Sequence, residues 1–286
     1  MVKNPRIDLI ADEQILSESV YADCVSPNGR NAVIVRLCRY PEQSISWLWI
    51  YCFLTQGTYG YNNNYLPSSK NISLVEEPDI IYRQSGQEEA IFRRNGPRDS
   101  PIGAHITVNV RGHKGSKNPQ NPGPHKIQIE GDFKPKYKPW KMNRYRTEWL
   151  STAKIVVNID DNHTKFDGYG HWHEQHQIAP RWKTRFTYLS LRGKELSLIG
   201  TATEPNDSGF IVKSSKRVKI NKIKIDPPSE VRNINIKLDD YSSLEGKIHT
   251  AHKYWVPVYS RWLEGTIVRA EIGKVKLTGC VNDWII

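Results

Sequence analysis

The sequence predicts an all-β protein built as two lobes, each an antiparallel β-barrel or half-barrel. Apolar and polar residues alternate with period two along the whole chain, as in residues 126–130, 233–238 and 274–277. This pattern is typical of strands that bury one face. Gly, Pro, Asn and Asp separate these segments, and the best helical pattern, over residues 7–19, is short. Antiparallel strands in such numbers hide their edges by closing into barrels or sandwiches.

The length of 286 residues allows one large β-rich domain or two of ordinary size. Residues 134–141 are rich in Pro, Lys and aromatic residues, a composition that suits a connector between lobes. We therefore expect an N-terminal lobe over residues 1–140 and a C-terminal lobe over residues 141–286. The many Pro, Gly and Asn residues of segment 95–124 predict a long exposed loop, a candidate lid.

Charge and hydropathy exclude several classes of protein. The formal net charge is +11, but the lysines of segment 217–225 alternate with apolar residues as on the wet face of a strand, so we expect no nucleic-acid partner. No apolar run approaches 18 residues, and the N-terminus has no secretory pattern, which predicts a cytoplasmic protein without a membrane span. The four cysteines lie far apart, which predicts free thiols. The oligomeric state stays open.

The richest stretch chemically is segment 166–176, which holds three of the nine histidines. Side chains alternate between the two faces of a strand. The segment therefore divides into Tyr169, His171 and His173 on one face and Trp172, Glu174 and His176 on the other. Histidine beside a carboxylate suits proton transfer to an apolar substrate. The candidate catalytic residues are His171, His173, Glu174 and Tyr169, and either face is a possible wall of the site.

Aromatic and basic residues supply candidates for substrate binding. The segment 46–53 places Trp47 and Trp49 on one face of a predicted strand. The segment 180–188, which we expect to pair with the histidine-rich strand, adds stacking rings and cations that would meet a carboxylate. The candidates are Trp47, Trp49, Trp172, Arg181, Trp182, Arg185 and Tyr188. Ordinary core packing and strand alternation explain the same patterns equally well.

Cofactor and metal motifs give little support to other chemistries. The sequence has no dinucleotide-binding glycine motif after a strand, no P-loop and no nucleophile elbow, so we expect no cofactor. His171 and His173 have the spacing of two metal ligands on one strand, which His176, Glu174, His249 or His252 would have to complete. No further ligand follows at a characteristic interval, so the leading prediction includes no metal.

Three short segments resemble a known family. Residues 46–51, residues 168–175, and residues 263–265 with 273–279 are similar to segments of the two-lobe lipocalin-like family of carotenoid hydratases and natural-product cyclases. That family tends to place an acid before its central histidine and Trp-Gly after it. Here His171 takes the place of the acid, and Glu174-Gln175 replace Trp-Gly. The resemblance implies two calycin-like lobes and a hydrophobic pocket reached by this strand, with Glu174 as a possible replacement acid.

The leading functional prediction is a cofactor-independent acid/base enzyme of secondary metabolism. It would cyclise, isomerise or hydrate an apolar, conjugated or aromatic intermediate, and an anionic one would suit Arg181 and Arg185. Two alternatives remain: a non-catalytic lipocalin-like carrier of a pigment or lipid, and a metal-dependent hydrolase or lyase that uses the histidine cluster.

Overall fold

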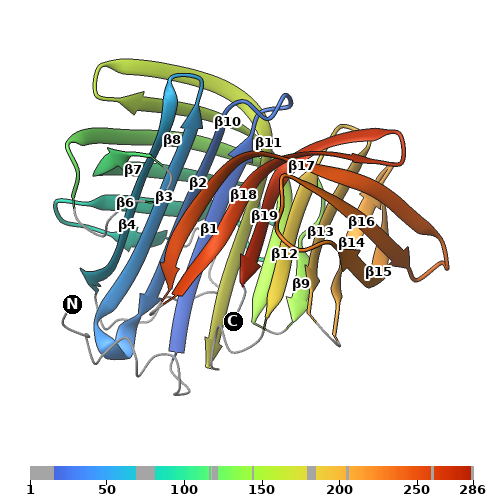
Figure 1. Cartoon of the computed structure of the whole chain (residues 1–286). Helices are drawn as coiled ribbons and strands as arrows, with labels where there is room; N and C mark the ends of the chain where they lie inside the picture. The colour runs from blue at the N-terminus through green and yellow to red at the C-terminus, as the bar shows by residue number, and fades with distance from the viewer. Residues whose placement is uncertain are drawn as a thin grey trace. The chain divides into compact units, whose positions relative to one another are not determined.

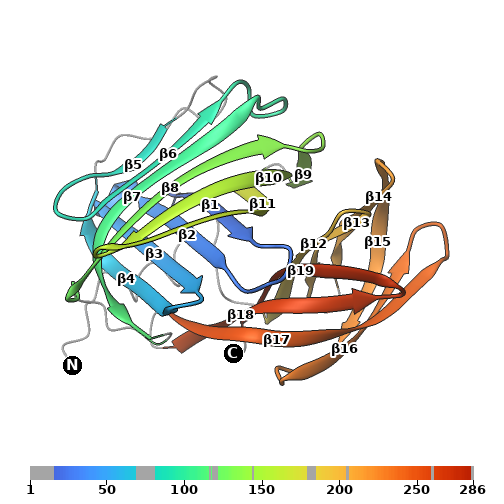
Figure 2. The same ribbon diagram turned by 90° about the horizontal axis from the view of Figure 1, so that it is seen from above.

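The structure is a computed structural model, which describes residues 16–68, 81–115, 117, 122–143, 145–178, 185–203, 206–258 and 261–284. In these ranges the regular elements are antiparallel strands and one short 3-10 helix, Pro41–Gln43 (Figures 1 and 2). The all-β prediction is therefore confirmed. The helix expected over residues 7–19 lies partly outside the described residues, and Leu16 already begins a strand.

The chain divides into two compact units. Unit 1 comprises Met1–Cys24 and Asn31–Arg181, and unit 2 comprises Val25–Arg30 and Trp182–Ile286. The boundary expected near residue 140 instead falls inside unit 1. Residues 134–141 join strands of one sheet, because the strand that ends at Pro135 and the strand that begins at Trp140 both pair with the same neighbour. The histidine-rich strand consequently belongs to unit 1.

Unit 1 is an 11-stranded antiparallel sheet with the order β4-β3-β2-β1-β11-β10-β8-β7-β6-β5, and β9 pairs with β10. A further pairing of β4 with β7 brings two distant parts of this order together. The strands are β1 (Leu16–Val25), β2 (Ala32–Tyr40), β3 (Ile45–Leu54), β4 (Gly57–Pro67), β5 (Ile81–Gln84), β6 (Glu89–Asn95), β7 (Gly103–Lys114), β8 (His125–Pro135), β9 (Trp140–Asn143), β10 (Arg146–Ile159) and β11 (Asn162–Ile178).

Alternation along these strands builds the core of unit 1. Alternate apolar residues of β1, β2 and β3, such as Val20, Val35 and Ile50, join one apolar cluster that Trp149 and Trp172 also enter. The strand β7 contributes Ile106 and Val108 to it. The long loop expected over residues 95–124 is therefore wrong in its middle part, where β7 alternates between buried apolar and more exposed polar residues.

Unit 2 contains a closed antiparallel barrel of strands β12 to β19 in sequence order. The strands are β12 (Phe186–Arg192), β13 (Leu196–Ala202), β14 (Ser208–Lys213), β15 (Lys216–Ile225), β16 (Val231–Leu238), β17 (Ser243–Val258), β18 (Arg261–Ile272) and β19 (Val275–Trp284). Inward residues such as Leu189, Ile236 and Val281 form its core. The strand β12 pairs with β13 and β19, so its expected pairing with the histidine-rich strand is wrong.

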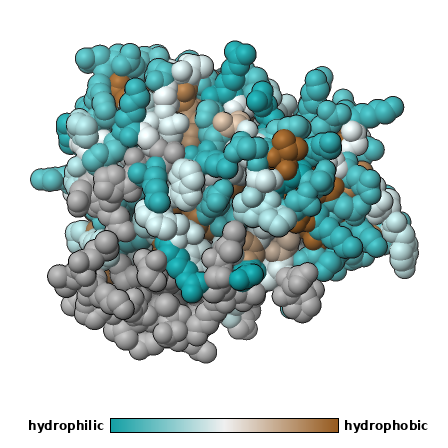
Figure 3. Space-filling view, viewed as in Figure 1, coloured by the Kyte–Doolittle hydropathy of each residue, from teal (hydrophilic) through white to brown (hydrophobic). Residues whose placement is uncertain are grey.

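The visible surface is polar, and the cysteines lie in the interior. The face of the molecule in Figure 3 is mostly hydrophilic, with hydrophobic residues in small separate patches. The strand β15 alternates as expected, with Lys219 and Lys224 exposed and Ile223 buried. All four cysteines are buried, and none of them forms a disulfide. No helix among the described residues has the length and apolar character needed to cross a membrane.

Candidate functional site

The hairpin of β10 and β11 positions the histidines. Its turn lies at Asp160 and Asp161, and Asp160 has a positive φ of 51°, a conformation that Asp tolerates better than most residues. The register of the hairpin places Glu148 opposite His173. Side chains at directly opposite positions share one face of a sheet. Glu148, His171 and His173 therefore lie on the same face of unit 1.

His171 lies between two buried carboxylates on this face. Its Nε2 is 3.1 Å from Oε2 of Glu148, and its Nδ1 is 3.4 Å from Oδ2 of Asp23. Asp23 comes from β1, the neighbour of β11 on its other side. The side chains of Asp23, Glu148 and His171 have no exposed area. An ionised group in such a place is costly unless an opposite charge accompanies it.

Arg146 and His173 extend the cluster. The guanidinium of Arg146 forms an ion pair with Glu148 and donates to Nδ1 of His173 at 3.3 Å. Because that nitrogen accepts a hydrogen bond, the proton of a neutral His173 ring lies on Nε2. The ring of Tyr21 stacks on His173 at 5.0 Å and an interplanar angle of 9°. Arg146 thus adds a positive charge beside the two buried carboxylates, Asp23 and Glu148.

Aromatic residues continue the same face across β3 and β4. Trp49 donates its indole N–H to Asn64 at 2.7 Å, and Asn62 donates to the Tyr51 hydroxyl at 2.6 Å. Trp47 stacks on Trp49 at 5.8 Å. All five side chains are buried. The sequence-predicted pair Trp47 and Trp49 thus lies on the histidine face, and hydrogen bonds to two asparagines fix the neighbouring rings.

The opposite face of β11 points into the core of unit 1. Trp172 is fully buried and stacks on Trp149 at 5.7 Å. The Glu174 carboxylate accepts hydrogen bonds from Arg94 at 2.7 Å, from the Trp172 indole at 3.0 Å and from the Tyr82 hydroxyl at 3.0 Å. The sequence left open which face lines a site. Trp172 and Glu174 lie on the core face, and the two histidines lie on the opposite face. Trp172 packs in the core, and Glu174 accepts hydrogen bonds from its three neighbours.

His176 closes this interior network. Its Nε2 is 3.0 Å from the Tyr82 hydroxyl. Because an ionised Glu174 only accepts hydrogen bonds, the Tyr82 proton goes to Glu174, and a neutral His176 donates Nε2–H to the Tyr82 oxygen. Burial, together with the nearby cations Arg98, Arg39 and Arg94, lowers the pKa of His176 to about 3. His176 is therefore a neutral structural histidine at physiological pH.

The other predicted residues do not meet at this cluster. Tyr169 lies on the histidine face of β11, in the alternation before His171, and is half-buried. Tyr188 is buried and Arg185 is exposed, and both belong to unit 2. Arg181 and Trp182 lie outside the described residues.

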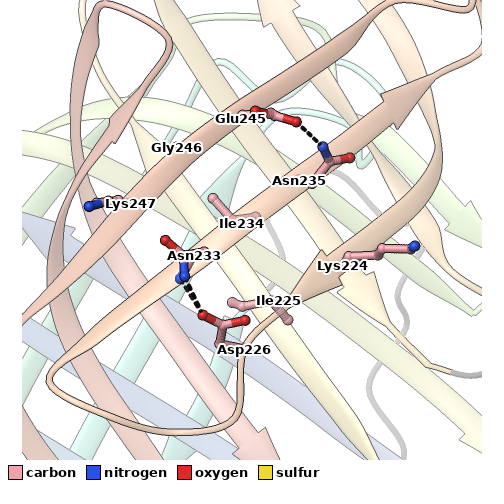
Figure 4. Close-up of a pocket in the computed structure, with 9 residues that line it drawn as sticks. All are labelled: Lys224, Ile225, Asp226, Asn233, Ile234, Asn235, Glu245, Gly246 and Lys247. Carbon is pink, nitrogen blue, oxygen red and sulfur yellow. Dashed lines mark hydrogen bonds between the residues drawn. The ribbon is translucent and has the colours of Figure 1, made fainter.

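Two other kinds of site bear on the function, a metal site and a surface hollow. Among the described residues, no three His, Cys, Asp or Glu side chains converge as ligands for a metal ion. The two ring nitrogens of His171 face carboxylates on opposite sides of the ring, which is not a convergent arrangement. A separate hollow of about 560 Å³ lies over β15, β16 and β17 (Figure 4). Its Asn233 and Asn235 bind Asp226 and Glu245, and it contains no sequence-predicted residue.

Sequence reasoning missed several members of the cluster. Glu148 and Arg146 could have been found, because counting back equally from the turn at Asp160 and Asp161 places Glu148 opposite His173. Asp23 and Tyr21 carry no local signal, since only the pairing order of β1 and β11 brings them to the histidines.

Comparison with known proteins gives matches of structure only. No family model matches the chain, and no curated protein sequence is significantly similar to it. CghA, crystallised with Sch210972, matches with a TM-score of 0.65 and 10% identity, over 96% of this chain and 89% of that one. A putative AttH from Nitrosomonas europaea has a TM-score of 0.64 and 8% identity, with 96% and 94% covered.

A third match, kievitone hydratase from Nectria haematococca, has a TM-score of 0.56 and 10% identity, with 96% of this chain and 91% of that one covered. Identities this low establish the fold and leave the chemistry to the site itself. At the level of the fold, these structural matches confirm the resemblance that the three sequence segments indicate. The chain has the two-lobe lipocalin-like fold of these proteins.

Proposed function

We propose that the protein is a cofactor-independent acid/base enzyme that acts on an apolar, conjugated or aromatic small molecule. The observation that carries this proposal is the placement of His171 between Asp23 and Glu148, with Arg146 on Glu148. The four side chains are balanced in charge when the His171 ring carries both protons. A buried imidazolium held in this way is a positioned general acid for an alkene, enol or carbonyl.

The choice of His171 over Glu174 rests on hydrogen bonding. Both oxygens of Glu174 already accept from Arg94, Trp172 or Tyr82, and the carboxylate lies among core residues. An ionised Glu174 in this network only accepts hydrogen bonds and has no proton to donate, whereas a His171 ring that carries both protons has one to give. On the other face, His173 and Tyr21 stack beside His171 and provide an aromatic surface for a substrate. We assign proton transfer to His171 and positioning of the substrate to His173 and Tyr21.

The aromatic rings on this face suit an unsaturated substrate. Trp47, Trp49 and Tyr51 present large, neutral π-surfaces, and aromatic faces attract the positive charge that develops when an alkene is protonated. Burial raises the pKa of Tyr51, which keeps its hydroxyl neutral. A match named as a hydratase and a match crystallised with a small molecule are compatible with this chemistry. The reaction we propose is cyclisation, isomerisation or hydration.

Elemental composition provides the test. Cyclisation and isomerisation leave the elemental composition of a molecule unchanged, and hydration adds one water. None of these reactions is an oxidation or a reduction. The purified protein is incubated without added cofactor in an organic extract of its source organism and profiled by mass spectrometry. We expect a consumed compound and a product that are isomers or differ by one water. The substitution His171→Gln should slow this conversion by about 10²–10⁴-fold.

Matched variants make the outcome decisive. Glu174→Gln, if its far-ultraviolet spectrum matches the native protein, should retain turnover within a few-fold, because the proposal gives Glu174 no chemical step. A product that has lost two hydrogens or gained one oxygen would contradict the proposal. A compound that stays bound and unchanged in both native protein and His171→Gln would identify a carrier instead.

A further inference from the structure

The hollow over β15, β16 and β17 has two asparagines of β16 at its centre, and a carboxylate holds each of them (Figure 4). Asn235 donates its amide N–H to Glu245 at 2.7 Å. Asn233 donates its amide N–H to Asp226 at 2.7 Å, and its backbone N–H donates to the same carboxylate oxygen at 2.9 Å. Each amide thus uses its nitrogen on a carboxylate, and neither Oδ1 atom accepts a hydrogen bond from the described residues.

Four charged side chains of alternating sign surround the two asparagines. In Figure 4 they follow one another in the order Glu245, Lys224, Asp226, Lys247. The register produces this order, since Lys224 and Glu245 both lie opposite Asn235. Lys247 lies opposite Asn233. Neither lysine forms an ion pair with a described residue. The lining has no net charge, so an ion at its centre would be attracted and repelled about equally.

Gly246 lies between the two charged residues that β17 contributes to the hollow. A Cβ added there would lie 2.8 Å from Cα of Ile272 and still nearer to the carbonyl oxygen of Glu271, so any side chain would meet the backbone of β18. A glycine inside a strand often marks a tight bend or the close approach of a backbone or a ligand. Ile225 and Ile234 add a small apolar part to the lining.

These groups define the chemistry of a ligand. The volume of about 560 Å³ lies within the usual range of small-molecule sites, about 300–1,000 Å³. The amide and carboxylate oxygens accept hydrogen bonds and the ammonium groups donate them, whereas a hydroxyl group does both. A neutral molecule with several hydroxyl groups can therefore satisfy the whole lining. An anion or a cation would meet a like charge beside each opposite one.

We propose that this hollow is a binding site for a neutral saccharide of one or two rings. The sugar hydroxyls donate to Oδ1 of Asn233 and Asn235 and accept from Lys224 and Lys247, and C–H groups of the ring cover the isoleucines. Two strand spacings, about 10 Å, separate β15 from β17, a width that suits one or two sugar rings. The carboxylates already fix the asparagines, so ordering them costs little when a sugar binds. The site belongs to unit 2, and binding there does not require the reaction proposed for His171 of unit 1.

Saturation-transfer NMR tests the site with four neutral disaccharides: maltose, cellobiose, lactose and sucrose. We expect native protein to bind at least one of them with a millimolar or lower Kd. Asn235→Leu keeps the size of the side chain and removes its hydrogen-bonding groups. It should weaken this binding about tenfold, the effect of losing one or two hydrogen bonds. Lys247→Met, on another strand, should weaken it as well, so the test remains available if Asn235→Leu does not fold.

The control is Lys213→Gln, which changes an exposed lysine of β14 outside the hollow. It should bind the sugar as native protein does, and an equal loss there would show a general charge effect and overturn the proposal. Binding of none of the four sugars by native protein, or an affinity unchanged in folded Asn235→Leu and Lys247→Met, would overturn it too. Glucuronic acid and glucosamine complete the panel. A native preference for either over all four disaccharides would reveal a site for ions and refute the neutral class of ligand.

Discussion

Among the residues that the structure describes, His176 has the environment that most clearly couples stability to pH. Its folded pKa of about 3 lies below the ordinary histidine value of 6.5. Above pH 6.5 neither state binds the proton, so the effect is absent. Below pH 6.5 the unfolded chain takes up a proton that the folded chain refuses, and the free energy of unfolding falls until the pH reaches about 3.

Urea unfolding at two pH values measures this coupling. Between pH 7.5 and pH 5, the group should cost native protein about 2 kcal/mol of unfolding free energy. The variant His176→Gln has no titrating group at position 176. Its unfolding free energy should therefore fall by about 2 kcal/mol less than that of native protein over the same pH interval. Equal losses in the two proteins would show that His176 is not buried among Arg39, Arg94 and Arg98 as the structure has it.

At the residue level, the sequence indicated part of the candidate site. The histidine-rich segment and the alternation of its two faces were recognisable, because a strand imposes period two on any sequence. Asp23 was not recognisable, since it is separated from His171 by nearly the whole of unit 1 and reaches it only through the pairing of β1 with β11. Long-range strand pairing leaves no mark on the residues around either partner.

The strand β11 has a steric requirement at Gly170. A Cβ added there would lie 2.2 Å from Ser151 Oγ and 2.9 Å from a ring carbon of Phe133. Ser151 is directly opposite Gly170 in the register with β10. Glycine lets β10 and β11 approach at the level of the histidines, and any side chain there must displace buried neighbours.

The substitution Gly170→Ala should therefore lower the free energy of unfolding by about 1–3 kcal/mol, as overpacking of a filled core does. Thermal and urea unfolding measure it. Adding Ser151→Ala removes the nearest atom, so the double variant should recover part of the loss. A Gly170→Ala protein as stable as native would contradict the close approach of the two strands.

Elements differed in how well the sequence predicted them. The strand over residues 233–238 was recognised by its apolar alternation, and the strand over residues 46–53 by its continuous run of aromatic and apolar residues. The strand β7 was missed because Pro, Gly and Asn on both sides dominate the composition of segment 95–124. Its own alternation of Ile106, Val108 and Val110 was present and was outweighed by that average.

For the whole molecule, the sequence predicted two units and misplaced their boundary. The Pro-rich, polar composition of residues 134–141 predicts a connecting segment. Composition alone does not distinguish a connection between two strands of one sheet from a linker between two domains. The decisive fact is which strands pair. Since β10 hydrogen-bonds to both β8 and β11, the chain stays in unit 1 until Arg181.

The net charge of +11 leads to a prediction about the molecule as a whole. Several surface lysines form ion pairs with carboxylates. Lys253 is 2.8 Å from Glu230, and Lys219 is 4.0 Å from Asp239. We expect a labelled DNA duplex to bind no more tightly than about 10⁻⁴–10⁻⁶ M at physiological salt, the ordinary non-specific range. Fluorescence anisotropy measures it, with duplexes of unrelated sequence as controls. Nanomolar, sequence-dependent binding would contradict the prediction.

The two unlike faces of β11 limit how this protein can change over evolutionary time. His171 and His173 alternate with Trp172 and Glu174, and the two faces belong to the candidate site and to the core respectively. Substitutions on one face leave the other intact, so the candidate site and the core can diverge separately. A one-residue insertion or deletion would exchange the two faces. Within this segment, related chains should therefore differ by substitutions, or by length changes of an even number of residues.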